Sequence, residues 1–302
     1  MHHIFYHANC ADGFAARCIA QLALGTANVA YWPIQYEGPQ MSQAIEPRDQ
    51  VTYLDYPPPP SILEKLITEM QCRVLVIDHH DTAKKIHEER LVPWESIFAQ
   101  SSSGAGLAWQ HYFPGQEMPY AVGMVQFRDL GRPWHPEFQG KPSAVNALDF
   151  HAYLMRCLPR TPEAWTPVLM TPIISDLVVA LNTGAILTAQ DRAMIEAASP
   201  TAVKIQIGGQ IVPAFIGFPA SLVSDALNHL LQIHPEAPFS ANVYPDPKTG
   251  RLIYSLRSTD DRAHVGEIAK RLDPPRDGYP GGGGHHNAAG FSSDSPIPFV
   301  LS

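Results

Sequence analysis

The stretch Val74-Leu75-Val76-Ile77-Asp78-His79-His80 decides the fold of this chain. Its apolar run is short and rich in β-branched residues, which is typical of a buried strand in a parallel sheet. Ligands of open α/β sheets bind outside the carboxyl ends of such strands, where Asp78, His79 and His80 fall. A carboxylate beside imidazoles suits Mn, Fe or Zn. Taken alone, the motif fits a strand followed by a polar loop equally well.

Two other predicted strands end in residues of the same kind. Strands are expected over residues 4–7, 29–32 and 51–55, and helices over 14–24 and 61–70. Alternating strands and helices imply right-handed β-α-β units and a parallel sheet. His7, Asp55 and Asp78-His79-His80 should therefore meet along one edge of that sheet.

Three further polar motifs are ambiguous when each is taken alone. Asp12 follows the first strand and fits the N-cap of the next helix as well as it fits a ligand. Ser101-Ser102-Ser103-Gly104-Ala105-Gly106 precedes a helix over 107–112, which it would cap unless its amides hold an anion. Asp129 ends a predicted helix over 120–130 beside Arg128, a pair that is most often a surface ion pair.

The second part of the chain has a different pattern. Helices are expected over 143–200, including 170–181 and 188–198, and short strands follow over 203–207, 211–215, 241–244 and 252–257. Helices over 222–231 and 265–272 interrupt these strands, and a hairpin turn is expected over 246–250 with Gly250 at positive φ. We therefore predict an α/β domain over 1–186, a helical linker over 187–202 and a smaller α+β domain over 203–302.

A glycine-rich stretch, Gly281-Gly282-Gly283-Gly284-His285-His286-Asn287-Ala288-Ala289-Gly290, lies near the end of the second domain. Glycine repeats are commonly flexible surface loops. Here the apolar residues that follow at once indicate that the stretch leads into packed structure. Glycine amides approach a ligand closely and form an anion-binding concavity, and His285 adds a donor that is partly charged near neutral pH.

Composition limits the class of protein and its partners. The 302 residues are 45% hydrophobic and carry a net charge of −8, with no evident basic track for a long nucleic acid. The four cysteines form no C-x-x-C pair, which fits a reducing compartment. Because we find neither a membrane span nor a signal peptide, we expect a cytoplasmic protein without long double-stranded nucleic acid or membrane as partners. Whether it forms a homodimer is left open.

Taken in order, these motifs resemble those of the DHH phosphoesterases that carry the DHH-associated C-terminal domain, the RecJ and nanoRNase-like proteins. The resemblance spans nearly the whole chain. It implies a Rossmann-like DHH domain with two divalent metal ions, expected to be Mn²⁺, and an active site in the cleft between the domains. The implied activity is hydrolysis of short oligonucleotides or linear dinucleotides to mononucleotides. The residues that carry the resemblance are His7, Asp12, Gly13, Asp55, Asp78, His79, His80, Asp129 and the stretch from Gly282 to Gly290.

The resemblance also implies a role for each position. His7 would bind the first metal, Asp55 would bridge both metals, and Asp12, His79 and Asp129 would hold the second. Of the catalytic pair, His80 would face the substrate phosphate and Asp78 would orient a histidine. The residues expected to bind the substrate are Arg257, Ser258, Gly282, Gly283, Gly284 and His285.

Cys10 departs from the family pattern, which usually has a carboxylate two residues before the Asp12 position. A thiolate ligand at Cys10 would favour Zn or Fe over Mn. Alternatively, Cys10 is an unliganded small residue, and Asn9 substitutes in part.

Two other functions stay open at this stage. One is a phosphatase that acts on 3′,5′-bisphosphorylated nucleosides and releases free phosphate. The other is a nucleotide-binding regulatory protein with impaired catalysis, and the replacement of the usual carboxylate by Cys10 is the observation that suggests it. The retained ligand residues at the other positions argue against it.

Overall fold

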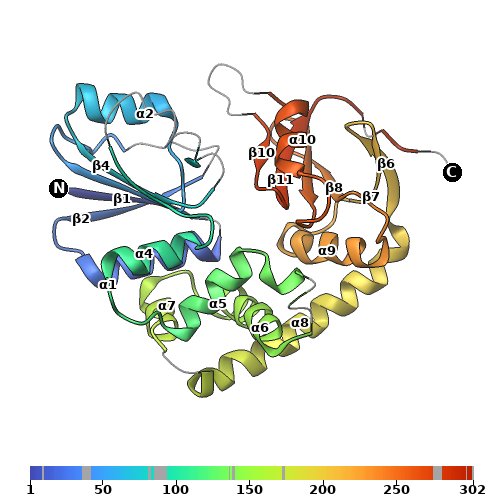
Figure 1. The fold of residues 1–302 in the computed structure, drawn as a ribbon, viewed down its shortest axis with the longest axis horizontal. Coiled ribbons are helices and arrows are strands. Elements are labelled where there is room, and N and C mark those ends of the chain that lie inside the picture. Colours follow the sequence, from blue (N-terminus) through green and yellow to red (C-terminus); the bar gives the residue numbers. More distant parts are fainter. Residues whose placement is uncertain are drawn as a thin grey trace. The chain divides into compact units, whose positions relative to one another are not determined.

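The structure, a computed structural model, divides into two compact units, Met1–Thr188 and Ala189–Ser302. Figure 1 draws the elements of each unit. Asn9, a candidate substitute ligand, lies outside the described residues. These are 1–8, 10–35, 42–80, 83–84, 94–135, 137, 140–171, 174–274, 281–296 and 298–300.

The first unit is built on a parallel sheet, as predicted. Its strand order is β2-β1-β3-β4-β5, and all four pairings are parallel. The short last strand was not expected from the sequence. The strands are β1 (His2–His7), β2 (Val29–Ile34), β3 (Gln50–Leu54), β4 (Arg73–Asp78) and β5 (Glu95–Phe98).

The register of the central strands aligns their polar ends. Tyr6 of β1 pairs with Leu54 of β3, and Leu54 pairs with Ile77 of β4. The next residues along these strands are His7, Asp55 and Asp78. These three therefore stand level at the carboxyl edge of the sheet.

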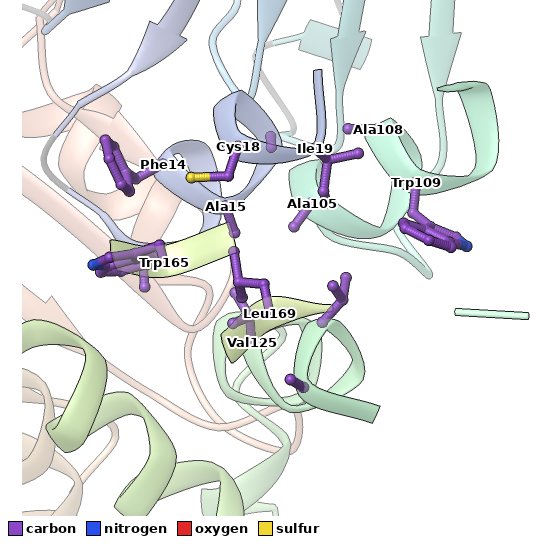
Figure 2. Close-up of a cluster of buried hydrophobic side chains, with 14 of the residues drawn as sticks. Phe14, Ala15, Cys18, Ile19, Ala105, Ala108, Trp109, Val125, Trp165 and Leu169 are labelled. Carbon is purple, nitrogen blue, oxygen red and sulfur yellow. The ribbon is translucent and has the colours of Figure 1, made fainter. Parts of the chain in front are cut away.

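Helices cover both faces of this sheet. Ile4 and Tyr6 point to the cluster built with α1, α4, α5 and α7, whereas Phe5 points to the opposite cluster with α2, because strand side chains alternate. Figure 2 shows the first cluster. In it the rings of Phe14 and Trp165 meet edge to face, with their centroids 4.9 Å apart. The helices are α1 (Ala11–Leu24), α2 (Pro60–Glu64), continued by a π-helix (Lys65–Glu69), α4 (Gly104–Tyr112), α5 (Tyr120–Asp129), α6 (Pro142–Cys157) and α7 (Pro162–Leu169).

The expectation of separate helices over 170–181 and 188–198 is wrong. One helix, α8 (Val178–Ala198), runs through the unit boundary, and Gly184 lies in its interior. A Cβ atom at Gly184 would lie 1.9 Å from the carbonyl oxygen of Asp149 in α6. The glycine therefore allows a close helix contact and does not end the helix. Single turns of 3₁₀ helix occur at Arg132–Trp134, Ile174–Leu177, Ser199–Thr201 and Ala220–Leu222.

The second unit is an α+β fold on a mixed sheet of order β10-β11-β9-β8-β7-β6. The pair β7 and β8 is parallel and the other pairs are antiparallel. Gly250, in the turn between β8 and β9, has a φ of 71°, as expected. The elements are β6 (Val203–Ile207), β7 (Gln210–Ile216), α9 (Val223–Ile233), β8 (Ser240–Pro245), β9 (Leu252–Arg257), α10 (Val265–Leu272), β10 (Gly283–Gly284) and β11 (Ala288–Ser293).

Among the residues that the structure describes, no helix is both long and apolar enough to cross a membrane.

Candidate metal centre

Asp55 lies at the middle of the polar edge of the first sheet and is 2% exposed. It follows β3 with a φ of 55°, a left-handed conformation that Asp adopts more readily than most residues. Its Oδ1 lies 3.3 Å from Nε2 of His79, and its Oδ2 lies 3.6 Å from Nδ1 of His7. The two oxygens of one carboxylate thus face two different histidines.

On the Oδ1 side, Asp12, His79 and Asp129 form one group of potential metal ligands, with ligand atoms within 4.8 Å of one another. Nε2 of His79 lies 3.3 Å from Oδ2 of Asp129. Asp12 is 1% exposed, and its Oδ2 is buried without a hydrogen-bond partner among the described residues. An unsatisfied buried carboxylate oxygen is costly, and a cation would remove that cost.

On the Oδ2 side, His7, Cys10 and Asp55 form a second group. The sulfur of Cys10 lies 3.3 Å from Nδ1 of His7 and 3.2 Å from Oδ2 of Asp55. The same sulfur accepts the amide of Gly13 at 3.1 Å and so caps the first turn of α1. Cys10 is thus both a helix cap and a member of the candidate ligand set.

Asp78 organises the two histidines that follow it. Its Oδ1 accepts the amides of His79 at 2.6 Å and of His80 at 3.1 Å. The same oxygen lies 2.5 Å from Nδ1 of His80. This arrangement fixes the loop after β4 and the ring of His80.

Ser103 is a functional residue whose role sequence reasoning missed. Its hydroxyl donates to Oδ1 of Asp12 at 2.5 Å, and the amide of Ala105 donates to the same oxygen at 3.1 Å. Ser103 also caps α4 by accepting the amide of Gly106. Both interpretations of the serine- and glycine-rich stretch therefore hold, and the anion held by the helix start is the protein's own Asp12.

Gly104 allows the two carboxylates to come close. A Cβ atom at this position would lie 2.5 Å from Cβ of Asp55 and 2.8 Å from Oδ2 of Asp12. A side chain at residue 104 would therefore displace one of these acids. The Ser-Gly pair in the sequence is the only signal of this packing, and helix capping alone explains it equally well.

The ionisable groups of the site shift one another's pKa values. Burial and the neighbouring Asp129 and Asp55 raise the pKa of Asp12 well above its usual range. Burial would also raise the pKa of Asp55, but hydrogen bonds with His7 and His79 hold it well below that range. Burial opposes protonation of His79 and His80, yet the surrounding carboxylates raise their pKa values to about 10 and about 9. The site thus concentrates negative charge that positive charge must balance.

The donor set fits divalent cations. Nitrogen, oxygen and sulfur ligands converge in one group on each side of the Asp55 carboxylate, and a buried carboxylate oxygen of Asp12 lacks a donor among the described residues. Carboxylate and imidazole ligands together suit Mn, Fe and Zn.

In the second unit, sheet register brings the expected substrate residues together. Arg257 of β9 pairs with Ala288 of β11, and Ala288 accepts the amide of His285 at 2.7 Å. The guanidinium of Arg257 donates to Oγ of Ser224 at 2.7 Å. Ser258 is buried, and its hydroxyl donates to the carbonyl of Pro238 at 3.3 Å.

The glycine-rich stretch is a hairpin packed on α10. The amide of Gly282 donates to the carbonyl of Asp273 at 2.6 Å, so the fold itself uses this amide. A Cβ atom at Gly282 would lie 2.6 Å from the carbonyl oxygen of Ala269, and Gly284 has a φ of 141°. Close packing and backbone conformation therefore account for part of the glycine content that the sequence assigned to phosphate binding.

Solved structures share this fold. The DHH domain of a protein described as a member of a ribosomal protein family superposes with a TM-score of 0.56 and 13% identity, over 99% of this chain and 82% of that one. RecJ of Thermus thermophilus in complex with Mn²⁺ superposes with a TM-score of 0.52 and 16% identity, over 99% of this chain and 53% of that one. An exonuclease RecJ bound to manganese superposes with a TM-score of 0.50 and 16% identity, over 97% of this chain and 86% of that one. The chain therefore has the DHH/RecJ-like fold that its motifs predicted.

The comparisons of sequence are more limited. No protein-family model matches the chain. An uncharacterized protein of Acanthamoeba polyphaga mimivirus is 26% identical over 307 aligned positions, which cover 96% of this chain. The chain spans 66% of the length of that relative.

Proposed function

We propose that this protein is a metal-dependent phosphoesterase whose centre lies at the carboxyl edge of the first sheet. The arrangement of Asp55 carries the proposal, because its two oxygens face two separate groups of potential ligands. Asp55 would bridge two metal ions. His7 would hold the ion on one side, and Asp12, His79 and Asp129 would hold the ion on the other. The RecJ proteins of the same fold bind Mn²⁺ in their crystals, and the carboxylate-rich group of Asp12, His79 and Asp129 suits Mn²⁺.

Two bound divalent cations would supply an acidified water and neutralise the phosphoryl oxygens of a substrate. The chain's own contribution centres on His80. Asp78 holds Nδ1 of His80 at 2.5 Å, so Nε2 is the nitrogen that would meet the substrate. Without bound metal, neighbouring carboxylates raise the pKa of His80 to about 9. His80 would stabilise charge on the phosphate or protonate the leaving oxygen.

The substrate we propose is a short oligonucleotide or linear dinucleotide, cleaved to mononucleotides. Arg257 has a planar guanidinium whose shape matches a phosphate, and a substrate phosphate would replace its bonds to Oγ of Ser224 and the carbonyl of Leu256. Its β9 position pairs with Ala288, which accepts the amide of His285. A phosphate anchored there would favour short substrates or cleavage from an end. The net charge of −8 agrees, since long nucleic acids usually require a basic surface.

A labelled substrate panel tests the activity. The metal-loaded protein is incubated with dinucleotides, longer RNA, single-stranded DNA, cyclic dinucleotides and a 3′,5′-bisphosphonucleoside, and the products are separated. We expect mononucleotides from dinucleotides, a severe loss in His80→Ala, and no change in His234→Ala, whose ring pairs with Glu236 in the other unit. Release of free phosphate from the bisphosphonucleoside alone would favour the phosphatase. Absence of hydrolysis across the panel with Mn²⁺, Mg²⁺ or Zn²⁺ would refute the proposal.

A further inference from the structure

The two groups of potential ligands on either side of the Asp55 carboxylate differ in their chemistry. Asp12, His79 and Asp129 offer two carboxylates and an imidazole, whereas His7, Cys10 and Asp55 offer an imidazole, a sulfur and a carboxylate. Carboxylates suit Mg and Mn, while thiolates select Zn and other soft or borderline metals. A pair of cations bound here would therefore occupy unequal positions.

The spacing of the sulfur-containing group is close to that of a tetrahedral site. Bond lengths of about 2.3 Å for Zn–S and about 2.0–2.2 Å for Zn–N and Zn–O place tetrahedral sulfur about 3.5–3.7 Å from nitrogen or oxygen, and nitrogen about 3.3–3.6 Å from oxygen. The sulfur of Cys10 lies 3.3 Å from Nδ1 of His7 and 3.2 Å from Oδ2 of Asp55, and those two atoms are 3.6 Å apart. Small adjustments would bring all three ligand atoms to bonding distance of one ion.

The surroundings hold these atoms in place. Asp55 is 2% exposed, and the amide of Gly13 fixes the sulfur at 3.1 Å. A Cβ atom at Gly13 would lie 2.3 Å from the carbonyl oxygen of His7, so the chain packs tightly around the turn that carries Cys10. Oδ2 of Asp12, buried beside Gly104 and unpartnered among the described residues, is independent support for cation binding at this edge of the sheet.

We propose that Cys10 is a direct metal ligand, and that the position formed by His7, Cys10 and Asp55 prefers Zn²⁺ while its neighbour prefers Mn²⁺. This inference rests on the proposed metal centre and specifies its composition. Binding requires the thiolate, so the Cys10 proton passes to solvent when the ion enters. The alternative is a thiol that stays protonated and donates to Oδ2 of Asp55.

Cobalt substitution tests the ligation without measuring activity. Co²⁺ is titrated into the metal-free protein, and its visible bands and the near-ultraviolet sulfur-to-cobalt charge-transfer band are recorded. We expect both in the wild-type protein. Visible bands of bound Co²⁺ without the charge-transfer band would overturn the ligand role of Cys10 and leave the phosphoesterase proposal intact. No Co²⁺ binding at all would overturn both.

Cys10→Ser and Cys157→Ser are the matched variants. Serine is a favoured N-cap, so Cys10→Ser keeps the cap of α1 and removes only the sulfur, as circular dichroism will verify. Cys157 is exposed, and Cys18, Cys72 and Cys157 belong to no ligand group in the described ranges. The charge-transfer band should vanish in Cys10→Ser and persist in Cys157→Ser. Its persistence in a folded Cys10→Ser protein would contradict the proposal.

Metal competition gives a second readout. After dialysis against Mn²⁺ in large excess over Zn²⁺, which offsets the generally higher affinity of Zn²⁺, elemental analysis should find both metals in the wild-type protein. Cys10→Asp should exchange Zn²⁺ for Mn²⁺, with a loss of Zn²⁺ preference of about tenfold or more, since even residues beyond the ligands change affinity by about 10–100-fold. Identical metal contents for wild type, Cys10→Ser and Cys10→Asp would refute metal contact at this position.

Discussion

The hydroxyl of Ser103 donates a 2.5 Å hydrogen bond to Oδ1 of Asp12, across 91 positions of sequence. The amide of Ala105 reinforces the contact, and the other oxygen of Asp12 is left buried and unpartnered among the described residues. The start of α4 thus orients a carboxylate that would otherwise only begin α1. This contact joins the starts of α1 and α4 at the candidate metal centre.

Removing this hydroxyl should weaken metal binding without removing a ligand. Outer residues that orient metal ligands typically change affinity by about 10–100-fold, so we expect such a loss of Mn²⁺ affinity in Ser103→Ala. Ser102→Ala is the control, since its hydroxyl accepts a surface contact from Gln110. Calorimetric titration of both variants is the measurement. Equal Mn²⁺ affinities of the two variants would show that Ser103 does not orient a metal ligand.

The metal-free protein should lose stability as pH rises. Carboxylates raise the pKa of His80 from 6.5 to about 9, so the protonated ring stabilises the fold fully below about pH 6.5 and this contribution fades towards pH 9. At about 1.4 kcal/mol per unit, the ceiling is about 3 kcal/mol. Melting temperatures of chelator-treated wild type and His80→Asn should converge over that window. A constant difference would contradict this electrostatic account.

Arg257 should matter only for substrates that carry a second phosphate. Charge-assisted hydrogen bonds contribute about 1.5–3 kcal/mol, so Arg257→Ala should lower kcat/KM for a dinucleotide about tenfold to a hundredfold. Hydrolysis of a generic chromogenic phosphodiester should barely change. Lys248→Ala, which removes a cation from the turn after β8, controls for net charge. Equal losses on both substrates would show that Arg257 supports the fold or the metal site.

Substitution by alanine should have opposite effects on stability at Gly184 and Gly123. Gly184→Ala should destabilise by about 1–3 kcal/mol, because the new Cβ would lie 1.9 Å from the carbonyl oxygen of Asp149. Gly123→Ala in α5 has no atom within 4 Å of the new Cβ and should gain about 0.5–1 kcal/mol of helix propensity. Urea denaturation of both variants measures the difference. A stabilised Gly184→Ala protein would contradict the tight contact between α6 and α8.

The polar edge of the first sheet was predictable because strand direction determines it. Once β1, β3 and β4 are parallel, their carboxyl ends lie at one edge of the sheet, where His7, Asp55 and Asp78 stand. Asp129 was a weak candidate for a metal ligand on its own. In the structure its Oδ2 lies 3.3 Å from Nε2 of His79. Its place depends on the packing of α5, which no local pattern reveals.

Other features could not be obtained from local pattern. Residues 95–98 lack the apolar run of a buried strand, and β5 forms there through its pairing with β4. Separate helices were expected over 170–181 and 188–198, but the chain between them continues as α8, and Gly184 packs against Asp149 of α6. Ser103 was one of three consecutive serines, and only the folded chain shows which of them meets Asp12.

In the proposed phosphoesterase, Asp55 would bridge two metal ions that support hydrolysis. The direct test is Asp55→Asn, which keeps the side-chain shape but removes the charge shared by the two ligand groups. Metal content by elemental analysis and dinucleotide hydrolysis are measured on one preparation, with Asp176→Asn, an exposed site outside the centre, as the control. We predict that the bound metal falls below two ions per chain and that turnover is abolished while the fold is retained. Near-wild-type turnover with unchanged metal content would contradict the account.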